Sequence, residues 1–124
     1  MAGDGVFEQL VDHTFALGRT LHRLLREASD FEPLHEPECN IVAFRYVPES
    51  LRMAPAQIVD QLQREVRTQL IRSGRFYIVQ TVLDGRAVLR ATVMNPLTTE
   101  SDLRELLDEL RLLGKAVTAS LIRR

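Results

Sequence analysis

The spacing of apolar residues alternates between a helical period and short strand-like runs, and this alternation limits the folds that the chain can adopt. Three long segments repeat apolar residues every three or four positions, as the buried face of an amphipathic helix does: residues 6–28, 55–73 and 99–121. Between them lie runs rich in β-branched and aromatic residues, as is usual for strands: residues 39–47, 76–83 and 87–94. The predicted order of elements is therefore α-β-α-β-β-α.

Residues that cap or interrupt helices mark the boundaries in the first half of this pattern. Asp4 suits the N-cap of the first helix. Pro33 and Pro37 rule out continuation of that helix, so residues 30–37 are predicted to form a loop. Pro55 suits the first turn of the second helix, where its missing N–H costs nothing.

The second half carries a strong turn signal. Asp84-Gly85 joins two strand-like runs, and a type I′ turn needs positive φ at both of its central residues. A hairpin over residues 76–94 is therefore predicted. Gly74 stands where a left-handed residue would end the second helix. Residues 98–102 offer the hydroxyl and acidic groups that suit the start of the third helix.

Size and pattern together fit one α+β domain over residues 1–124. A chain of 124 residues has the usual size of a domain, and neither a repeat nor a long internal linker divides it. We expect a small, mostly antiparallel sheet covered on one face by helices, because this packing buries the apolar stripes of both kinds of element.

Charge and hydropathy exclude several classes of function. The formal net charge is −1, which gives no signal for nucleic acid or for an anionic membrane surface. No apolar run approaches the roughly 20 residues that span a bilayer, and the N-terminus lacks the pattern of a signal peptide. We therefore expect a cytoplasmic protein that has neither a nucleic-acid nor a membrane partner.

The histidines and the cysteine are better explained as structural residues than as a site. His13 and His22 lie nine positions apart in the first helix, whereas metal-binding histidines on a helix are usually three or four apart. His35 stands alone in a proline-rich stretch, and Cys39 opens a strand, where a small buried thiol is common. A single cysteine excludes an intrachain disulfide and a Cys-based metal cluster, so we expect no metal site.

Arg90 is the one candidate binding residue. Alternation along residues 87–94 places its guanidinium on the strand face that also carries Val88 and Thr92. An arginine in mid-strand is unusual if that face meets water, and costly if it is buried unpaired. A carboxylate ligand would resolve the conflict. The alternative is an edge-strand arginine whose charged end extends to solvent.

Several segments carry a resemblance to a known family: residues 36–48 (EPECNIVAFRYVP), 73–77 (SGRFY), 88–90 (VLR), 94–99 (MNPLTT) and 102–114. In this order they resemble the small C-terminal domain of the pyridoxal-phosphate (PLP)-dependent amino-acid decarboxylases of group II, which are related to glutamate and aromatic amino-acid decarboxylases. The resemblance extends over nearly the whole chain, from about residue 6. It implies the fold-type I architecture, in which a large domain binds the cofactor and the small domain packs beside the active site.

The resemblance also implies a role for Arg90 and a partner for the chain. The family's arginine at the segment that matches residues 88–90 binds the α-carboxylate of the substrate, so Arg90 is implied to contact the substrate. The implied partner is a large PLP-binding domain of the same enzyme, a carboxy-lyase that works as a homodimer. The chain would supply the carboxylate contact and pack against that domain.

The chain lacks what the chemistry of this family needs. In the family, a lysine that directly follows a histidine in the large domain forms the Schiff base, whereas the only lysine here, Lys115, follows Gly114. The resemblance therefore implies that this chain has no catalytic and no cofactor-binding residue, that PLP belongs to the parent enzyme, and that the chain alone does not decarboxylate. Two other interpretations stay open: a free-standing interaction or regulatory module that keeps the small-domain fold, and a generic ligand-binding domain of the ferredoxin-like kind.

Overall fold

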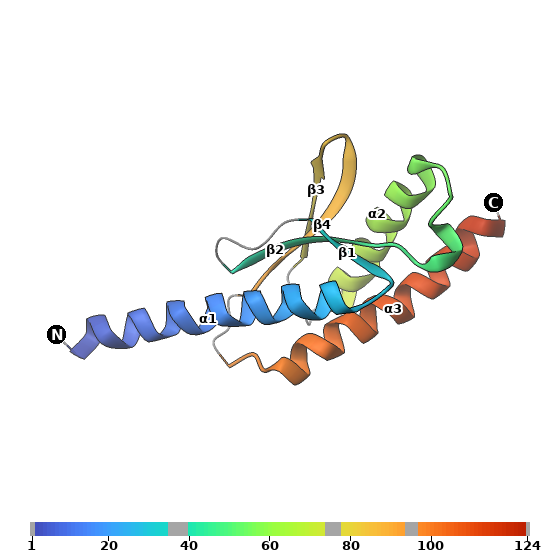
Figure 1. The fold of residues 1–124 in the computed structure, drawn as a ribbon. Coiled ribbons are helices and arrows are strands. Elements are labelled where there is room, and N and C mark those ends of the chain that lie inside the picture. The colour runs from blue at the N-terminus through green and yellow to red at the C-terminus, as the bar shows by residue number, and fades with distance from the viewer. Residues whose placement is uncertain (1, 35–39, 74–77, 94–96, 124) are drawn as a thin grey trace.

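The computed structural model of this chain describes residues 2–34, 40–73, 78–93 and 97–123. Helices and a four-stranded antiparallel sheet make up the fold (Figure 1), which confirms the α+β class. None of the helices in these segments is both long and apolar enough to cross a membrane. The elements in chain order are α1 (Ala2–Glu27), β1 (Phe31–Pro33), β2 (Ile41–Tyr46), the 3-10 helix η1 (Glu49–Leu51), α2 (Ala56–Ser73), β3 (Ile78–Leu83), β4 (Arg86–Thr92) and α3 (Glu100–Arg123).

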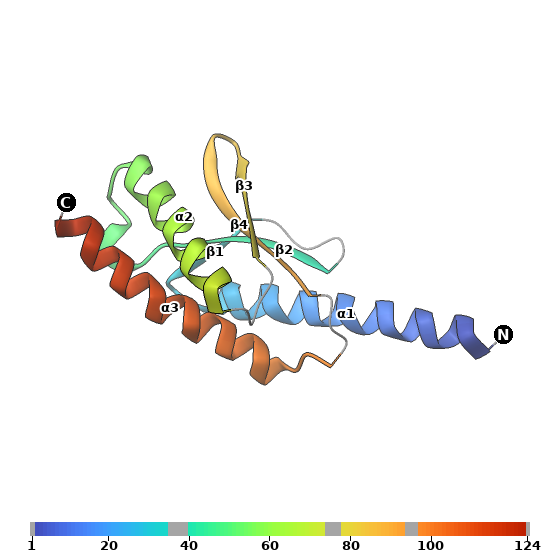
Figure 2. The same cartoon turned by 180° about the vertical axis from the view of Figure 1, so that it is seen from behind.

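The sheet has the strand order β1-β2-β4-β3, so β4 is a central strand between β2 and β3. Phe44 of β2 lies opposite Leu89 of β4, and Ile78 of β3 lies opposite Ala91. These four side chains are buried in the same apolar cluster as the leucines of the helices. The helices therefore cover this face of the sheet. Figure 2 shows α2 and α3 side by side, and α3 also packs against α1.

The structure corrects the loop predicted over residues 30–37. Phe31–Pro33 forms β1, which pairs with β2 at one edge of the sheet. Pro33 ends this strand, and proline is tolerated at a sheet edge because no ladder N–H is lost there. His35 and Cys39 lie outside the described residues.

The predicted helix starts also need correction. α1 begins at Ala2, so Asp4 lies inside this helix and is not its N-cap. α2 begins at Ala56, and the carbonyl of Pro55 accepts hydrogen bonds from the N–H groups of Ile58 and Val59. Pro55 therefore precedes the first turn instead of lying in it. Gly74 falls outside the described residues.

Two local signals are confirmed in detail. Asp84 and Gly85 have φ angles of 52° and 76°, as a type I′ turn between β3 and β4 requires. At the start of α3, Thr99 Oγ1 accepts a hydrogen bond from the Asp102 N–H at 3.2 Å, and Asp102 Oδ2 accepts one from the Thr99 N–H at 2.9 Å. This reciprocal pair is a capping box, which satisfies N–H groups that a helix leaves unpaired.

One apolar core joins the sheet to all three helices. Phe44 of β2 is fully buried, together with Leu21 and Leu25 of α1, Leu62 of α2 and Leu110 of α3. Each such side chain contributes about 1.5–3 kcal/mol relative to leaving it exposed. These residues belong to the helical stripes read from the sequence, apart from Phe44, which comes from the first predicted strand.

Tyr46, the last residue of β2, connects this core to α2 and α3. The buried Gln63 of α2 accepts a hydrogen bond from the Tyr46 N–H at 2.9 Å and donates one to the Tyr46 carbonyl at 2.6 Å. The amide thus takes the place of a neighbouring strand beside Tyr46. On α3, Gly114 lies against the ring, and a Cβ there would come within 2.8 Å of Cδ2 and Cζ. Only glycine fits this approach without a shift of the helix or the ring.

We expect Gln63→Leu to lower the free energy of unfolding by about 2–4 kcal/mol, because it leaves the buried N–H and C=O of Tyr46 without partners. Chemical denaturation followed by circular dichroism measures this. The matched control is Gln69→Leu, at an exposed position of the same helix, which should change stability by less than about 0.5 kcal/mol. Equal effects of the two substitutions would contradict the role given to Gln63.

We expect Gly114→Ala to destabilise the fold by about 1–3 kcal/mol, although alanine favours a helix more than glycine does. The reason is the overlap of the new Cβ with the ring of Tyr46. Ala116→Gly, at an exposed position of α3, isolates the helix-propensity effect and should cost about 1 kcal/mol. Thermal and denaturant unfolding of both variants checks the pair, and a stabilised Gly114→Ala protein would show that α3 does not need this close approach.

Candidate functional site

Arg90 lies at the middle of the central strand, on the sheet face that points away from the helices. Its neighbours Leu89 and Ala91 belong to the core, so strand alternation directs Arg90 to the opposite face. Its partners across the sheet are Ala43 of β2 and Val79 of β3. The side chain of Arg90 is exposed and makes no ion pair or hydrogen bond within the part of the chain that the structure describes. Because β4 is a central strand, Arg90 is not an edge-strand arginine.

Arg45 shares this face and was not singled out from the sequence. It follows Ala43, the partner of Arg90, by two positions on β2, so the two guanidinium groups leave the same side of the sheet. In contrast to Arg90, Arg45 is buried, with Nη1 3.5 Å from Glu32 and Nη2 3.8 Å from Asp60. Its Nε has no hydrogen-bond partner among the described residues. The available signal was a charged residue inside the otherwise apolar run of residues 41–47.

Asp60 also connects β2 and β4 where their backbones no longer pair. Its Oδ1 accepts a hydrogen bond from the Ala87 N–H at 3.0 Å, where the pairing of β2 with β4 has already ended. The same oxygen is the one that lies near Arg45. One carboxylate of α2 therefore contacts both strands. We interpret the cluster of Arg45, Glu32 and Asp60 as structural support for the face that carries Arg90.

The histidines do not form a site with each other. His13 is exposed on α1, and His22 is half-buried, with an Nδ1 that has no partner among the described residues. No group of three or more His, Cys, Asp or Glu residues in the described segments is arranged to hold a metal ion. His35 and Cys39 were given structural explanations from the sequence, and these stay predictions because both residues are outside the described segments.

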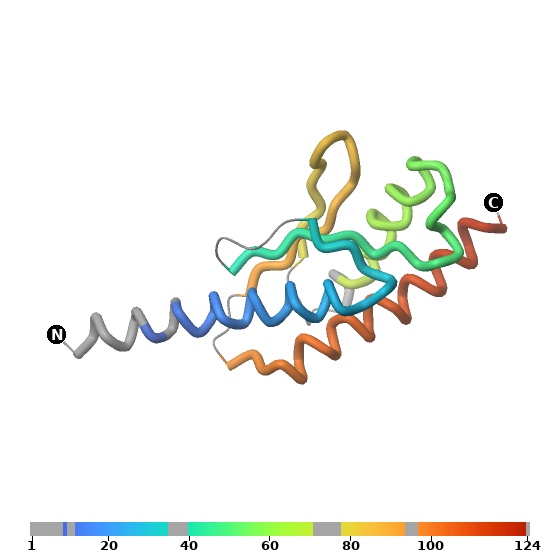
Figure 3. Tube along the Cα trace, viewed as in Figure 1, coloured from blue at the N-terminus to red at the C-terminus, as the bar shows by residue number. Residues whose placement is uncertain are grey.

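A concave region, separate from the sheet face that carries Arg90, lies between the C-terminal end of α1, the end of β2, η1 and α3. These four elements come together in the tube view (Figure 3). Asp30 and Arg111 form its best-defined contact, a two-point ion pair with distances of 2.7 Å from Nε to Oδ2 and 3.2 Å from Nη2 to Oδ1. The Arg111 guanidinium also lies 5.2 Å from the ring centroid of Phe31. Arg111 is thus held from two sides.

The pKa values of this region follow from these contacts. The hydrogen bond to Asp30 raises the pKa of Arg111 further above its already high value. Burial raises the pKa of Tyr46 above 10.0, the charge of Asp30 raises it further, and the charge of Arg111 opposes the shift. Tyr46 is therefore a neutral phenol under physiological conditions, which suits its position in the core.

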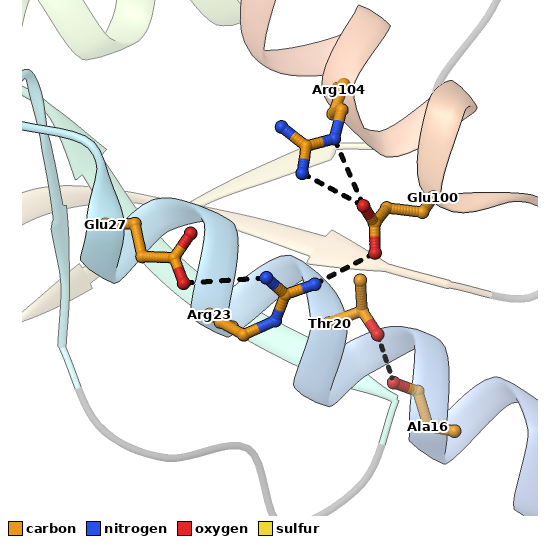
Figure 4. A network of polar contacts seen from close by, with 6 residues as sticks. All are labelled: Ala16, Thr20, Arg23, Glu27, Glu100 and Arg104. Atoms are coloured by element: carbon orange, nitrogen blue, oxygen red, sulfur yellow. Dashed lines mark hydrogen bonds and ion pairs between the residues drawn. The ribbon is translucent and has the colours of Figure 1, made fainter.

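A network of ion pairs joins α1 to the start of α3 (Figure 4). One oxygen of Glu100 accepts a hydrogen bond from Arg23 at 2.9 Å, and the other accepts two from Arg104 at 2.9 and 3.2 Å. The hydrogen bond from Arg104 is the main cause that lowers the pKa of the Glu100 carboxyl, and Arg23 adds to it. These side chains are largely exposed, so the network orients the two helices and contributes little stability.

Comparison with known proteins shows where such a domain occurs. No family model matches the chain. Over 119 residues it is 34% identical to the cysteine sulfinic acid decarboxylase of Mus musculus, covering 91% of this chain and 24% of that protein. Over 118 residues it is 25% identical to the aromatic-L-amino-acid decarboxylase of Bacillus atrophaeus, covering 95% of this chain and 24% of the relative. The chain thus spans about a quarter of the length of the curated relatives it matches.

The solved structures agree with the sequences. The crystal structure of mouse CSAD in apo form matches with a TM-score of 0.78 at 32% identity, over 86% of this chain and 24% of that chain. The chain is a homologue of the small C-terminal domain of PLP-dependent amino-acid decarboxylases. The structure of Oryza sativa TDC with PLP and tryptamine shares the fold of this chain, with a TM-score of 0.76 at 24% identity, over 87% of this chain and 23% of that one.

The residues of this chain do not fit a PLP site of their own. A PLP site requires a lysine that can form a Schiff base with the cofactor. Lys115 is the only lysine of the sequence, and it lies exposed on α3, after Gly114 and without a neighbouring histidine in the sequence. No step of cofactor chemistry can therefore be assigned to the residues of this chain.

We expect the stability of the chain to fall with rising pH above about pH 10 in part because of Tyr46. Its phenol has a higher pKa in the folded than in the unfolded chain, so its contribution is complete below the unfolded value and is lost as pH rises through the folded value. Urea unfolding between about pH 9 and 11 measures this. Tyr46→Phe should flatten the decline, while Tyr77, the other tyrosine of the sequence, is present in both proteins. Parallel pH profiles would rule out the shift.

Proposed function

We propose that this chain acts as the small C-terminal domain of a PLP-dependent amino-acid decarboxylase, and that Arg90 binds the α-carboxylate of the substrate. The observation that carries the proposal is the placement of Arg90 on the central strand of a domain homologous to part of such enzymes. Its side chain is exposed, and within the described residues it makes no ion pair or hydrogen bond.

Arg90 has the surroundings that a carboxylate clamp needs. Its backbone is fixed because β2 and β3 both pair with β4, while its side chain is exposed on the outer face. A guanidinium donates two parallel N–H groups to one carboxylate, which fixes the orientation of the ligand as well as its position. Holding the carboxylate that leaves as CO₂ sets the direction of the bond that breaks, and such positioning lowers the barrier of a reaction.

Arg45 assists this role without contacting the substrate. It is buried and lies between Glu32 and Asp60, so its side chain stays in the sheet face beside Arg90. Its two acidic partners carry two negative charges against its single positive charge, so this cluster adds no net positive charge to the face. The contribution of Arg45 is therefore structural.

The proposed partner is a large PLP-binding domain of the same enzyme, within a cytoplasmic homodimer. PLP bound by that domain supplies the electron sink of the reaction. Large apolar side chains outside the concave region between α1, β2, η1 and α3 are exposed in this chain and are candidates for burial by such a partner: Met53, Leu97 and Leu112, with exposed fractions of 97%, 82% and 71%. Side-chain selectivity of the enzyme would come from the large domain.

The test joins this chain to a decarboxylase whose matching C-terminal quarter has been removed, for example the cysteine sulfinic acid decarboxylase of mouse. We expect Arg90→Ala to lower kcat/KM about 100-fold, because two charge-assisted hydrogen bonds to the substrate are lost. The free energy of unfolding of the chain alone should change by less than about 0.5 kcal/mol. Arg86→Ala is the matched control, since Arg86 is exposed on the same face of β4.

Two results would overturn the assignment of Arg90: the same kcat/KM for Arg90→Ala and Arg86→Ala, or a loss of more than about 2 kcal/mol in the stability of the Arg90→Ala chain. The partner proposal has its own readout. Sedimentation velocity of the chain mixed with the truncated enzyme should show a complex, and two separate species at high concentration would contradict it.

A further inference from the structure

The groove beside Tyr46 is separate from the face that carries Arg90. It is lined by the end of α1, the end of β2, η1 and α3, and no residue of β4 contributes to it. Its volume is about 750 Å³, within the range of about 300–1,000 Å³ that is usual for small-molecule sites. The function proposed above gives this groove no role.

The walls of the groove are held in place before any ligand binds. Arg111 is fixed by its two-point ion pair with Asp30. Arg52 of the segment after η1 donates a hydrogen bond from Nη2 to the Ser29 carbonyl at 2.8 Å, which ties η1 to the end of α1. The backbone of Tyr46 is held by the amide of Gln63. A site that is already formed loses less conformational entropy on binding.

Two opposite charges lie on different walls of the groove. Glu49 comes from η1 and Lys115 from α3, and both line the groove. Neither side chain makes an ion pair or hydrogen bond with a residue that the structure describes. The groove therefore offers a separate carboxylate and a separate ammonium group to one ligand.

Thr118 places a further polar group next to Lys115. It lines the groove one helical turn further along α3, is 7% exposed, and its Oγ1 has no hydrogen-bond partner among the described residues. A threonine in a helix has two accessible χ1 rotamers, so this hydroxyl can turn toward a ligand oxygen. An unpaired buried hydroxyl costs free energy that a ligand acceptor would recover.

Part of the remaining lining is apolar, and the other part is polar and includes Ser50. Tyr46, Pro48, Ala119 and Ile122 belong to the apolar part, and Ile122 is 63% exposed. Burial of such surface contributes about 25 cal/mol per Å². The groove thus combines Lys115, Glu49 and an apolar area with charged side chains that other contacts already hold in place.

We propose that this groove binds a free α-amino acid with an apolar side chain. The carboxylate of the ligand pairs with Lys115, with Thr118 as a second donor, and its ammonium group pairs with Glu49. Its side chain lies on Tyr46, Pro48, Ala119 and Ile122. A ligand with a single charge would leave one of the two protein charges unpaired. The site is independent of Arg90 and of the decarboxylase role, and it would let an amino acid regulate the domain.

Three probes test this site: L-phenylalanine, phenylacetate, which lacks the ammonium group, and phenethylamine, which lacks the carboxylate. By calorimetric titration of the chain, we expect L-phenylalanine to bind at least about fivefold more tightly than either analogue. Lys115→Gln should weaken L-phenylalanine and phenylacetate but not phenethylamine. Glu49→Gln should weaken L-phenylalanine and phenethylamine but not phenylacetate. Both residues are exposed, so neither change should affect folding.

Arg86→Gln, at an exposed position of β4 outside the groove, is the control and should bind all three probes as the unsubstituted chain does. Amide chemical-shift changes should map to residues 28–30, 46–52 and 111–122. The proposal is overturned by a Kd for L-phenylalanine weaker than about 10 mM, by equal affinities for the three probes, or by affinities that neither variant changes. Shift changes centred on β4 would assign the binding to Arg90 instead and would leave the decarboxylase proposal standing without this one.

Discussion

The contact between Tyr46 and Gly114 sets how closely the helical layer approaches the sheet, and the other layers depend on it. Because residue 114 has no Cβ, α3 can lie directly against the ring at the end of β2. Phe31 packs on the same ring from β1, with centroids 5.3 Å apart, and Gln63 holds the backbone of Tyr46 from α2. Four elements therefore meet around one aromatic residue. A bulkier residue at 114 would separate α3 from β2 and open the core that joins the sheet to the helices.

Two arginines on one sheet face differ in burial and in their contacts. Arg45 lies among Ala43 and Val88, which are also buried, and Glu32 and Asp60 partly compensate its charge. Losing either acid would leave a buried charge more poorly paired, which is costly, so Arg45 is tied to its place. The side chain of Arg90 has no such constraint, because it is exposed and makes no ion pair or hydrogen bond within the described segments. The same type of side chain is therefore buried and paired in one strand and exposed in the next.

Local signals were read correctly where a few neighbouring residues decide the geometry. The positive φ angles at Asp84 and Gly85 and the capping box of Thr99 and Asp102 depend on the chain within a few residues. The prediction failed at β1, where Pro33 indicated a loop, because the strand exists only through its pairing with β2. The same distinction between local and tertiary features applies to the candidate site. Arg90 stood out as a charged residue in a strand, but its place in a central strand and its exposure could not be read from spacing.

The sequence by itself determined the α+β class, the buried helical stripes, the hairpin and the likeness to decarboxylase small domains, because periodicity and turn chemistry are properties of short segments. Only the tertiary structure decided which groups from distant segments meet. The pairing of Asp30 with Arg111, the amide of Gln63 on Tyr46, and the groove that holds Glu49 and Lys115 all join residues from different elements. Their partners are set by how helices pack on a sheet, and that packing depends on side-chain volumes such as the missing Cβ of Gly114.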